Sequence, residues 1–219
     1  RSSDPGGVDR GTRYGPATMS DGRPPRAQQL GIAVSRALDA EVSSVADVHG
    51  GDVAESFRMA LADGRIVFAK THRHPPPDFF VTEAVGLTWL RGAGAFGVPE
   101  VLAVRDDPPA LVLEWIDEGR PGATTEADLG RALAALHRAG APAFGREDRR
   151  TTGSRGLPNE CYDTWVEAYA ANRLRPLARM ARDGGALPES ACRDLEVVSG
   201  RLPELGGAPE PPARLHGHL

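Results

Sequence analysis

The 219-residue sequence has little of what membrane, disulfide-rich or nucleic-acid-binding proteins require. Its apolar residues never run together for the roughly 18 positions of a membrane span, and no signal-peptide pattern opens it. Its two cysteines, Cys161 and Cys192, have the spacing of neither a metal site nor a disulfide framework. A net charge of −4 offers no basic excess to nucleic acid or anionic lipid. We therefore expect a cytoplasmic protein with reduced thiols and with no nucleic-acid or membrane partner.

Lysine is almost absent, because 25 of the 26 basic residues are arginine and the remaining one is Lys70. Abundant Ala, Arg, Gly and Pro suggest a codon preference under which a dispensable surface lysine readily becomes arginine. A lysine that persists is explained by a need for a compact ammonium on a flexible stem, which a guanidinium does not replace. Chance survival at an exposed strand end explains it equally well at this point.

Hydrophobic periodicity divides the chain into three parts. Residues 1–25 are polar and Gly-rich, which predicts a disordered tail. Residues 26–117 predict a small antiparallel sheet lobe, since short alternating runs are separated by turn residues such as Asp63-Gly64. Residues 118–219 change to the 3.6-residue period of helices and predict a partial helical lobe. The predicted fold class is α+β, with one helix in the sheet lobe.

The expected elements follow from the same patterns. In the sheet lobe these are a helix at 26–38, strands at 42–48, 55–61 and 65–70, a helix from Asp78 to Arg91, and strands at 101–104 and 110–114. In the helical lobe they are helices at 126–139, from a cap at Asn159 to Arg182, and at 188–202.

Lys70 and Glu83 form the strongest candidate site. Lys70 shares a strand face with Ile66 and Phe68, and Glu83 lies on the apolar face of the next helix, four residues before Leu87. A carboxylate on a face that packs against a sheet is costly unless it is paired, and Lys70 is the nearest cation. A strand lysine held by a helix glutamate is the device that positions an ammonium over ATP phosphates. The alternative is a surface ion pair without function.

Two backbone segments could complete a nucleotide site. Gly50-Gly51 lies in a turn between two predicted strands, where main-chain amides could approach phosphates, although two glycines also suit an ordinary turn. The strand that ends in Glu114-Trp115-Ile116 suits a hinge whose backbone binds adenine, and it suits any buried strand equally.

Other candidates have a plain structural interpretation. His72 and His74 lack a third metal ligand nearby and are expected in a solvated loop. Trp165 and Tyr169, four residues apart, are expected to pack in the core, with substrate contact as the alternative. Arg146 belongs to a mixed-charge segment that is expected to be solvated, and His137 is expected to be a helix-end residue.

Taken in order, these pieces resemble the fructosamine (ketosamine) kinase family, in the aminoglycoside-phosphotransferase-like branch of the protein-kinase-like fold. The resemblance covers residues 27–219 and rests on Gly50–Arg58, Asp63–Lys70, Glu83–Leu90, Val98–Val101, Leu113–Trp115, Leu129–His137, Trp165, Arg173-Leu174 and Leu215–Leu219. It implies a two-lobed kinase, monomeric, that uses ATP and Mg²⁺ to phosphorylate a sugar hydroxyl of a ketosamine or other glycated amine.

The resemblance also implies roles for individual residues. Lys70 would hold the phosphates and Glu83 would hold Lys70, while Glu114 to Ile116 would face adenine. His216 and Gly217 would open the catalytic loop, and the family has Asp next, as the acceptor of the hydroxyl proton. This chain has His218 there, an imidazole that can accept a proton or carry a positive charge.

The metal-binding Asn and Asp of the family would lie beyond residue 219, so we expect the chain as it stands not to turn over ATP at a normal rate. Two alternatives remain open. One is a pseudokinase or nucleotide-binding module that has lost its base, and the other is a kinase for a different amine, such as an aminoglycoside.

Overall fold

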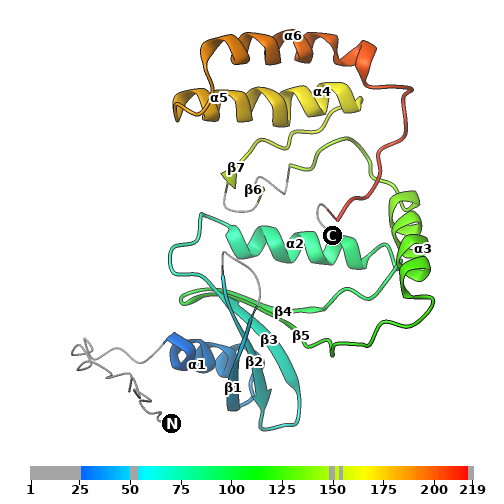
Figure 1. Cartoon of the computed structure of the whole chain (residues 1–219). Helices are drawn as coiled ribbons and strands as arrows, with labels where there is room; N and C mark the ends of the chain where they lie inside the picture. Colours follow the sequence, from blue (N-terminus) through cyan, green and yellow to red (C-terminus); the bar gives the residue numbers. More distant parts are fainter. Residues whose placement is uncertain (1–25, 50–53, 148–150, 153–154, 217–219) are drawn as a thin grey trace, which may run out of the picture.

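The computed structural model describes residues 26–49, 54–147, 151–152 and 155–216 (Figure 1). The predicted tail at 1–25, Gly50-Gly51, Gly217 and His218 lie outside the described residues. Within the described part, no helix has the length and hydrophobicity that crossing a bilayer requires.

A five-stranded antiparallel sheet forms the first lobe, as the alternating runs predict. Its strands are β1 (Val42–Val48), β2 (Glu55–Leu61), β3 (Ile66–Thr71), β4 (Val101–Asp106) and β5 (Pro109–Glu114). They are arranged in the order β1-β2-β3-β5-β4. β3 is therefore the central strand, paired with β2 on one side and β5 on the other.

Two helices cover this sheet, one on each face, at the two segments for which periodicity predicted helices (Figure 1). The single helix that the fold-class prediction gave this lobe is wrong. α1 (Arg26–Leu38) packs Leu30 and Val34 against one face, in a core that includes Met59, Val67 and Val112. α2 (Phe79–Arg91) covers the other face and packs against the alternate strand residues. Successive side chains of a strand point to opposite faces, so the two cores share the same strands.

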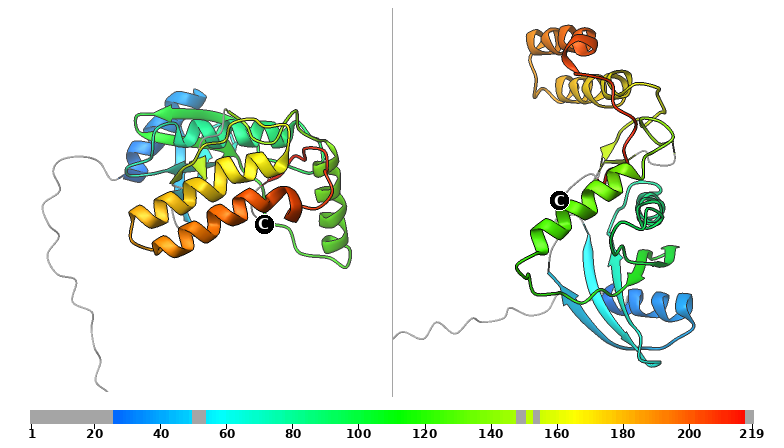
Figure 2. Two further views of the ribbon diagram at one scale, coloured as in Figure 1. Left: turned by 90° about the horizontal axis from the view of Figure 1, so that it is seen from above. Right: turned by 90° about the vertical axis from the view of Figure 1, so that its right-hand side faces the viewer.

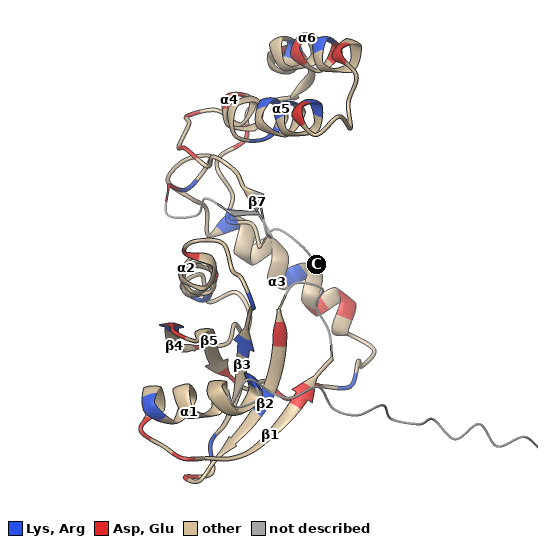
Figure 3. Cartoon of the chain, turned by 90° about the vertical axis from the view of Figure 1, so that its left-hand side faces the viewer, with Lys and Arg blue, Asp and Glu red and all other residues tan. Residues whose placement is uncertain are grey.

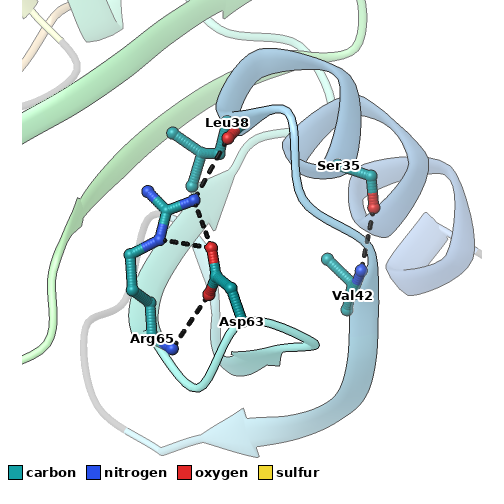
Figure 4. Close-up of polar contacts among 5 residues, drawn as sticks. All are labelled: Ser35, Leu38, Val42, Asp63 and Arg65. Atoms are coloured by element: carbon teal, nitrogen blue, oxygen red, sulfur yellow. Dashed lines mark hydrogen bonds and ion pairs between the residues drawn. The ribbon is translucent and has the colours of Figure 1, made fainter.

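The β2–β3 turn is tied to the end of α1 by Arg65 (Figure 4). Asp63 accepts hydrogen bonds from the Arg65 backbone N–H at 3.0 Å and from its Nε at 2.7 Å, while Arg65 Nη2 donates to the Leu38 carbonyl oxygen at 3.1 Å. The hydrogen bonds from Arg65 lower the pKa of the Asp63 carboxyl below its ordinary value. The ionised form of Asp63 is therefore favoured in the folded protein.

Asp63→Asn is expected to lower the Tm by about 2 °C at pH 7. A carboxyl whose pKa is depressed by folding stabilises the fold above its unfolded value of about 3.9 and loses that contribution as the pH falls through its folded value. The difference between parent and variant should therefore shrink below about pH 4. Thermal melts across pH 2–7 test this, with Asp47→Asn on β1 as the control. An equal difference at every pH would contradict it.

Beyond the sheet the described chain is mainly helical (Figure 2). α3 (Thr125–Arg138) is followed by the short strands β6 (Thr151–Thr152) and β7 (Arg155–Gly156). α4 (Trp165–Tyr169), a π-helical turn η1 (Ala170–Leu174) and α5 (Arg175–Asp183) form one nearly continuous rod, against which α6 (Glu189–Leu205) packs. In Figure 2 this α4–α6 layer lies at the end of the molecule remote from the sheet. Lys and Arg as well as Asp and Glu occur on both the sheet and the helical part (Figure 3).

The predicted helix start at Asn159 is wrong. The helix begins at Trp165, with Thr164 as the N-cap, whose hydroxyl accepts a hydrogen bond from the Glu167 N–H. The Asn159 side chain instead makes tertiary hydrogen bonds: its Nδ2 donates to the Arg146 carbonyl oxygen and its Oδ1 accepts from Arg173. A side chain with both a donor and an acceptor suits a junction between loops as well as it suits a cap.

Candidate functional site

Lys70 and Glu83 meet on the α2 face of the sheet, as their spacing predicted. The Lys70 ammonium lies 2.8 Å from Oε1 and 3.1 Å from Oε2 of Glu83. The two side chains are 24% and 31% exposed, so the pair is accessible at its edge. The Lys70 ammonium has three donor hydrogens, and both of the contacts given above are to the Glu83 carboxylate on α2.

Local packing explains why these two residues meet. On β3, Val67, Ala69 and Thr71 are buried toward α1, which turns Lys70 toward α2. Lys70 lies directly opposite Leu111 of β5, which belongs to the apolar cluster under α2. The helix contributes Phe80 and Ala84 to the same cluster, on either side of Glu83. The pair therefore stands at the border of an apolar core.

The predicted hinge begins at the last residue of β5. The Glu114 backbone N–H donates to the Glu100 carbonyl oxygen, and its carboxylate accepts from the Glu100 N–H at 3.1 Å and from Arg91 at 3.4 Å. Trp115 donates its indole N–H to Asp117 and lies under the Arg58 guanidinium. Ile116 is 53% exposed. The Glu114 side chain is therefore held by Glu100 and Arg91, and the contact of the Glu114 to Ile116 backbone with a base stays a prediction.

His216 is the one predicted catalytic-loop residue within the described part of the chain. Both of its ring nitrogens are buried, and neither has a hydrogen-bond partner among the described residues. A buried imidazole without partners is costly.

Magnesium, which the family resemblance implied, has no fit among the described residues. No three His, Cys, Asp or Glu side chains gather there in a way that could hold a metal ion. The Nδ1 of His72 accepts the backbone N–H of His74, and its ring lies beside Phe79, in agreement with the interpretation as a loop. Cys161 and Cys192 are free thiols, as expected.

Trp165 and Tyr169 are not core residues, contrary to the prediction. Their rings stack at 4.9 Å with an interplanar angle of 13°, and they remain 44% and 38% exposed. The four-residue spacing places both rings on one face of the helix, as periodicity predicts. It does not predict whether another part of the chain packs over that face.

Arg146 is also placed differently from the prediction of a solvated loop. Its guanidinium lies 4.2 Å from the ring centroid of Trp89, which lies on α2 six residues after Glu83. The loop reaches this position through Gly145, whose φ is +105° and where a Cβ would overlap the carbonyl oxygen of Glu160. Sequence reasoning missed the contact because its partners are 57 residues apart; Gly145 was the only local signal.

An antiparallel sheet with a helix-clamped lysine on its central strand, followed by a helical part, defines a protein-kinase-like fold. A solved "putative fructosamine-3-kinase" from Haemophilus somnus, 18% identical, has the same fold, with a TM-score of 0.69 over 81% of this chain and 63% of that one.

The chain belongs to the fructosamine kinase family, whose model matches residues 27–219. It is 33% identical over 178 residues to a "probable ketoamine kinase" of Synechocystis, which covers 78% of this chain and 58% of the relative. A crystal structure of a "putative fructosamine-3-kinase" from Thermobifida fusca is 36% identical, with a TM-score of 0.76 over 86% of this chain and 66% of that one. The chain thus spans somewhat more than half the length of the curated relative.

Proposed function

We propose that the chain carries the nucleotide-binding lobe and part of the acceptor lobe of a kinase that transfers phosphate from ATP to a sugar hydroxyl of a ketosamine. The observation that carries the proposal is the two-oxygen contact of Glu83 with the Lys70 ammonium. The names of relatives support the acceptor class, among them a protein-ribulosamine 3-kinase of Arabidopsis thaliana that is 28% identical over 82% of this chain and 56% of the relative. Phosphorylation of a sugar attached to an amine would serve deglycation-type repair.

Each residue has a distinct part in this proposal. Lys70 neutralises the phosphate oxygens while Glu83 fixes the ammonium, which lowers the cost of ordering a long side chain. The backbone of Trp115 and Ile116 would face the base, and the approach of the Gly50-Gly51 amides to the phosphates stays a prediction, because these glycines lie outside the described residues. His216 and Gly217 precede His218 in the sequence, and the neutral imidazole of His218 would accept the proton of the acceptor hydroxyl.

ATP is expected to raise the Tm of the 219-residue chain. A ligand at 100 times its Kd stabilises the folded state by about 2.7 kcal/mol, which corresponds to several degrees in a domain of this size. Thermal melts with increasing ATP, with and without Mg²⁺, measure the effect. Adenosine alone is the matched control, because it lacks the phosphates that Lys70 would hold. No shift with ATP at millimolar concentration would refute the proposed nucleotide site.

A second function is favoured by one residue. His218 occupies the position at which the family resemblance implies Asp. A neutral imidazole has one acceptor nitrogen, and its protonated form would stand near phosphates without accepting a proton. The chain would then bind nucleotide without transferring phosphate, as a pseudokinase does.

A further inference from the structure

Trp89 of α2 is contacted by two guanidiniums that come from distant parts of the chain. Arg146 lies 4.2 Å and Arg214 lies 4.5 Å from the centroid of its ring. Guanidiniums at this distance are attracted by the ring quadrupole. We call Trp89, Arg146 and Arg214 the Trp89 clasp.

Arg214 makes further contacts that fix its position. Its Nη1 donates to the Trp89 carbonyl oxygen at 2.7 Å, and its Nε donates to the Gly140 carbonyl oxygen at 3.4 Å. Just before Arg214, the Pro212 carbonyl oxygen accepts from the Ala141 N–H at 3.0 Å. The segment that enters His216, two residues after Arg214, is therefore bound to the ends of both α2 and α3.

Arg146 is held by a separate set of contacts in the helical part. Its backbone N–H donates to the Asn159 carbonyl oxygen at 2.9 Å, and Asn159 Nδ2 donates to the Arg146 carbonyl oxygen at 2.8 Å. Arg173 of η1 donates to Asn159 Oδ1 at 3.0 Å. These hydrogen bonds fix the backbone of Arg146, and its guanidinium extends from there to Trp89 on α2.

Glu83 and Trp89 are six residues apart on one helix, or about 9 Å along its axis. A helix is rigid over that distance, so whatever fixes one end restrains the other. A nucleotide that orders Lys70 and Glu83 at one end of α2 acts on the same body that the Trp89 clasp grips at the other.

We propose that Arg214 is a positioning residue: through the Trp89 clasp it holds the segment that enters His216 against the helix that carries Glu83, so that nucleotide binding at Lys70 also orders residues 212–216. This inference rests on the proposed function, because it requires a nucleotide at Lys70. In the proposed function Lys70 on β3 holds the phosphates, and the groups for transfer follow the segment that contains His216. Transfer requires a fixed distance between these two parts of the site.

Hydrogen exchange of the chain with and without ATP tests the inference. In the parent, ATP should slow exchange in β3 and α2 and, at least threefold, at the Ala141 amide, which reports on Pro212. In Arg214→Met the slowing in β3 and α2 should persist, with the ATP affinity changed less than threefold, while the slowing at Ala141 is lost. Arg214→Lys, which keeps a cation over the ring, should restore part of it. Arg131→Met on α3 is the control and should behave as the parent.

The outcomes separate the two proposals. Slowing at Ala141 that is equal in the parent and in Arg214→Met would overturn the inference while leaving the nucleotide site intact. If Arg214→Met changes the exchange rate at Ala141 by the same factor with and without ATP, the contact of Arg214 is only structural. That result would also overturn the inference. No effect of ATP on β3 would refute the proposed function, and the inference with it. If Arg214→Met does not fold, Arg146→Met must show a reduced slowing at Ala141.

Discussion

Replacement of Lys70 by alanine is expected to abolish the thermal stabilisation that ATP gives to the chain, with a loss of affinity of at least tenfold. The side chain supplies a charge that Glu83 holds at 2.8 Å in a partly buried setting, and tenfold in affinity corresponds to about 1.4 kcal/mol. Charge-assisted contacts to phosphate commonly exceed that amount. Thermal melts and calorimetric titration with ATP measure the loss.

Three further variants make this result specific to the ammonium. Lys70→Arg should fail to restore binding, because the planar guanidinium does not fit a site built for a compact ammonium. Glu83→Gln should weaken ATP binding less than Lys70→Ala, since the ammonium stays but is less firmly held. Arg131→Ala breaks an exposed ion pair with Asp128 on α3 and should have no effect. ATP binding by Lys70→Ala with the parent's affinity would rule out the proposed phosphate contact.

His218→Asp is expected to raise turnover by two or more orders of magnitude if the proton acceptor is the one missing group. General-base catalysis contributes roughly 10²–10⁴-fold, and a carboxylate at this position is what the family resemblance implies. The measurement is ADP release from ATP with a fructosyl amine as acceptor, compared between the parent and the variant. His137→Asp, which makes the same change on the exposed last turn of α3, is the matched control.

A parent that already turns over at an ordinary kinase rate would show that phosphate transfer does not need a carboxylate at position 218. No gain from His218→Asp, in a protein that binds ATP normally, would favour the nucleotide-binding module without transfer. The two experiments on positions 70 and 218 therefore distinguish a loss of ATP binding from a loss of phosphate transfer.

The sheet lobe was largely predictable because its signals are local. Alternation in β2 and β3 and the Asp63-Gly64 turn define a hairpin without any distant information, and the structure confirms it. The Lys70–Glu83 contact could also be predicted, since a carboxylate on an apolar helix face needs a cation and few were within reach. The roles of these residues toward ATP stay predictions.

Contacts between distant loops could not be predicted in the same way. Asn is a residue type that often caps helices. Only the folded chain shows that the Asn159 side chain forms hydrogen bonds with Arg146 and Arg173 instead. The exposure of Trp165 was missed for a related reason: a spacing of four states which rings share a helix face and leaves open what lies opposite. His216 shows the same limit, because its burial depends on how the last described segment is laid against α2 and α3.

Gly145 has a consequence for how relatives of this chain can vary. With a Cβ excluded there by the Glu160 carbonyl oxygen, an exchange of this glycine forces the loop outward and withdraws the next side chain from Trp89. A homologue that carries a larger residue at the equivalent of position 145 should therefore have abandoned the arginine after it. Glycine and arginine are thus expected to be inherited or lost together.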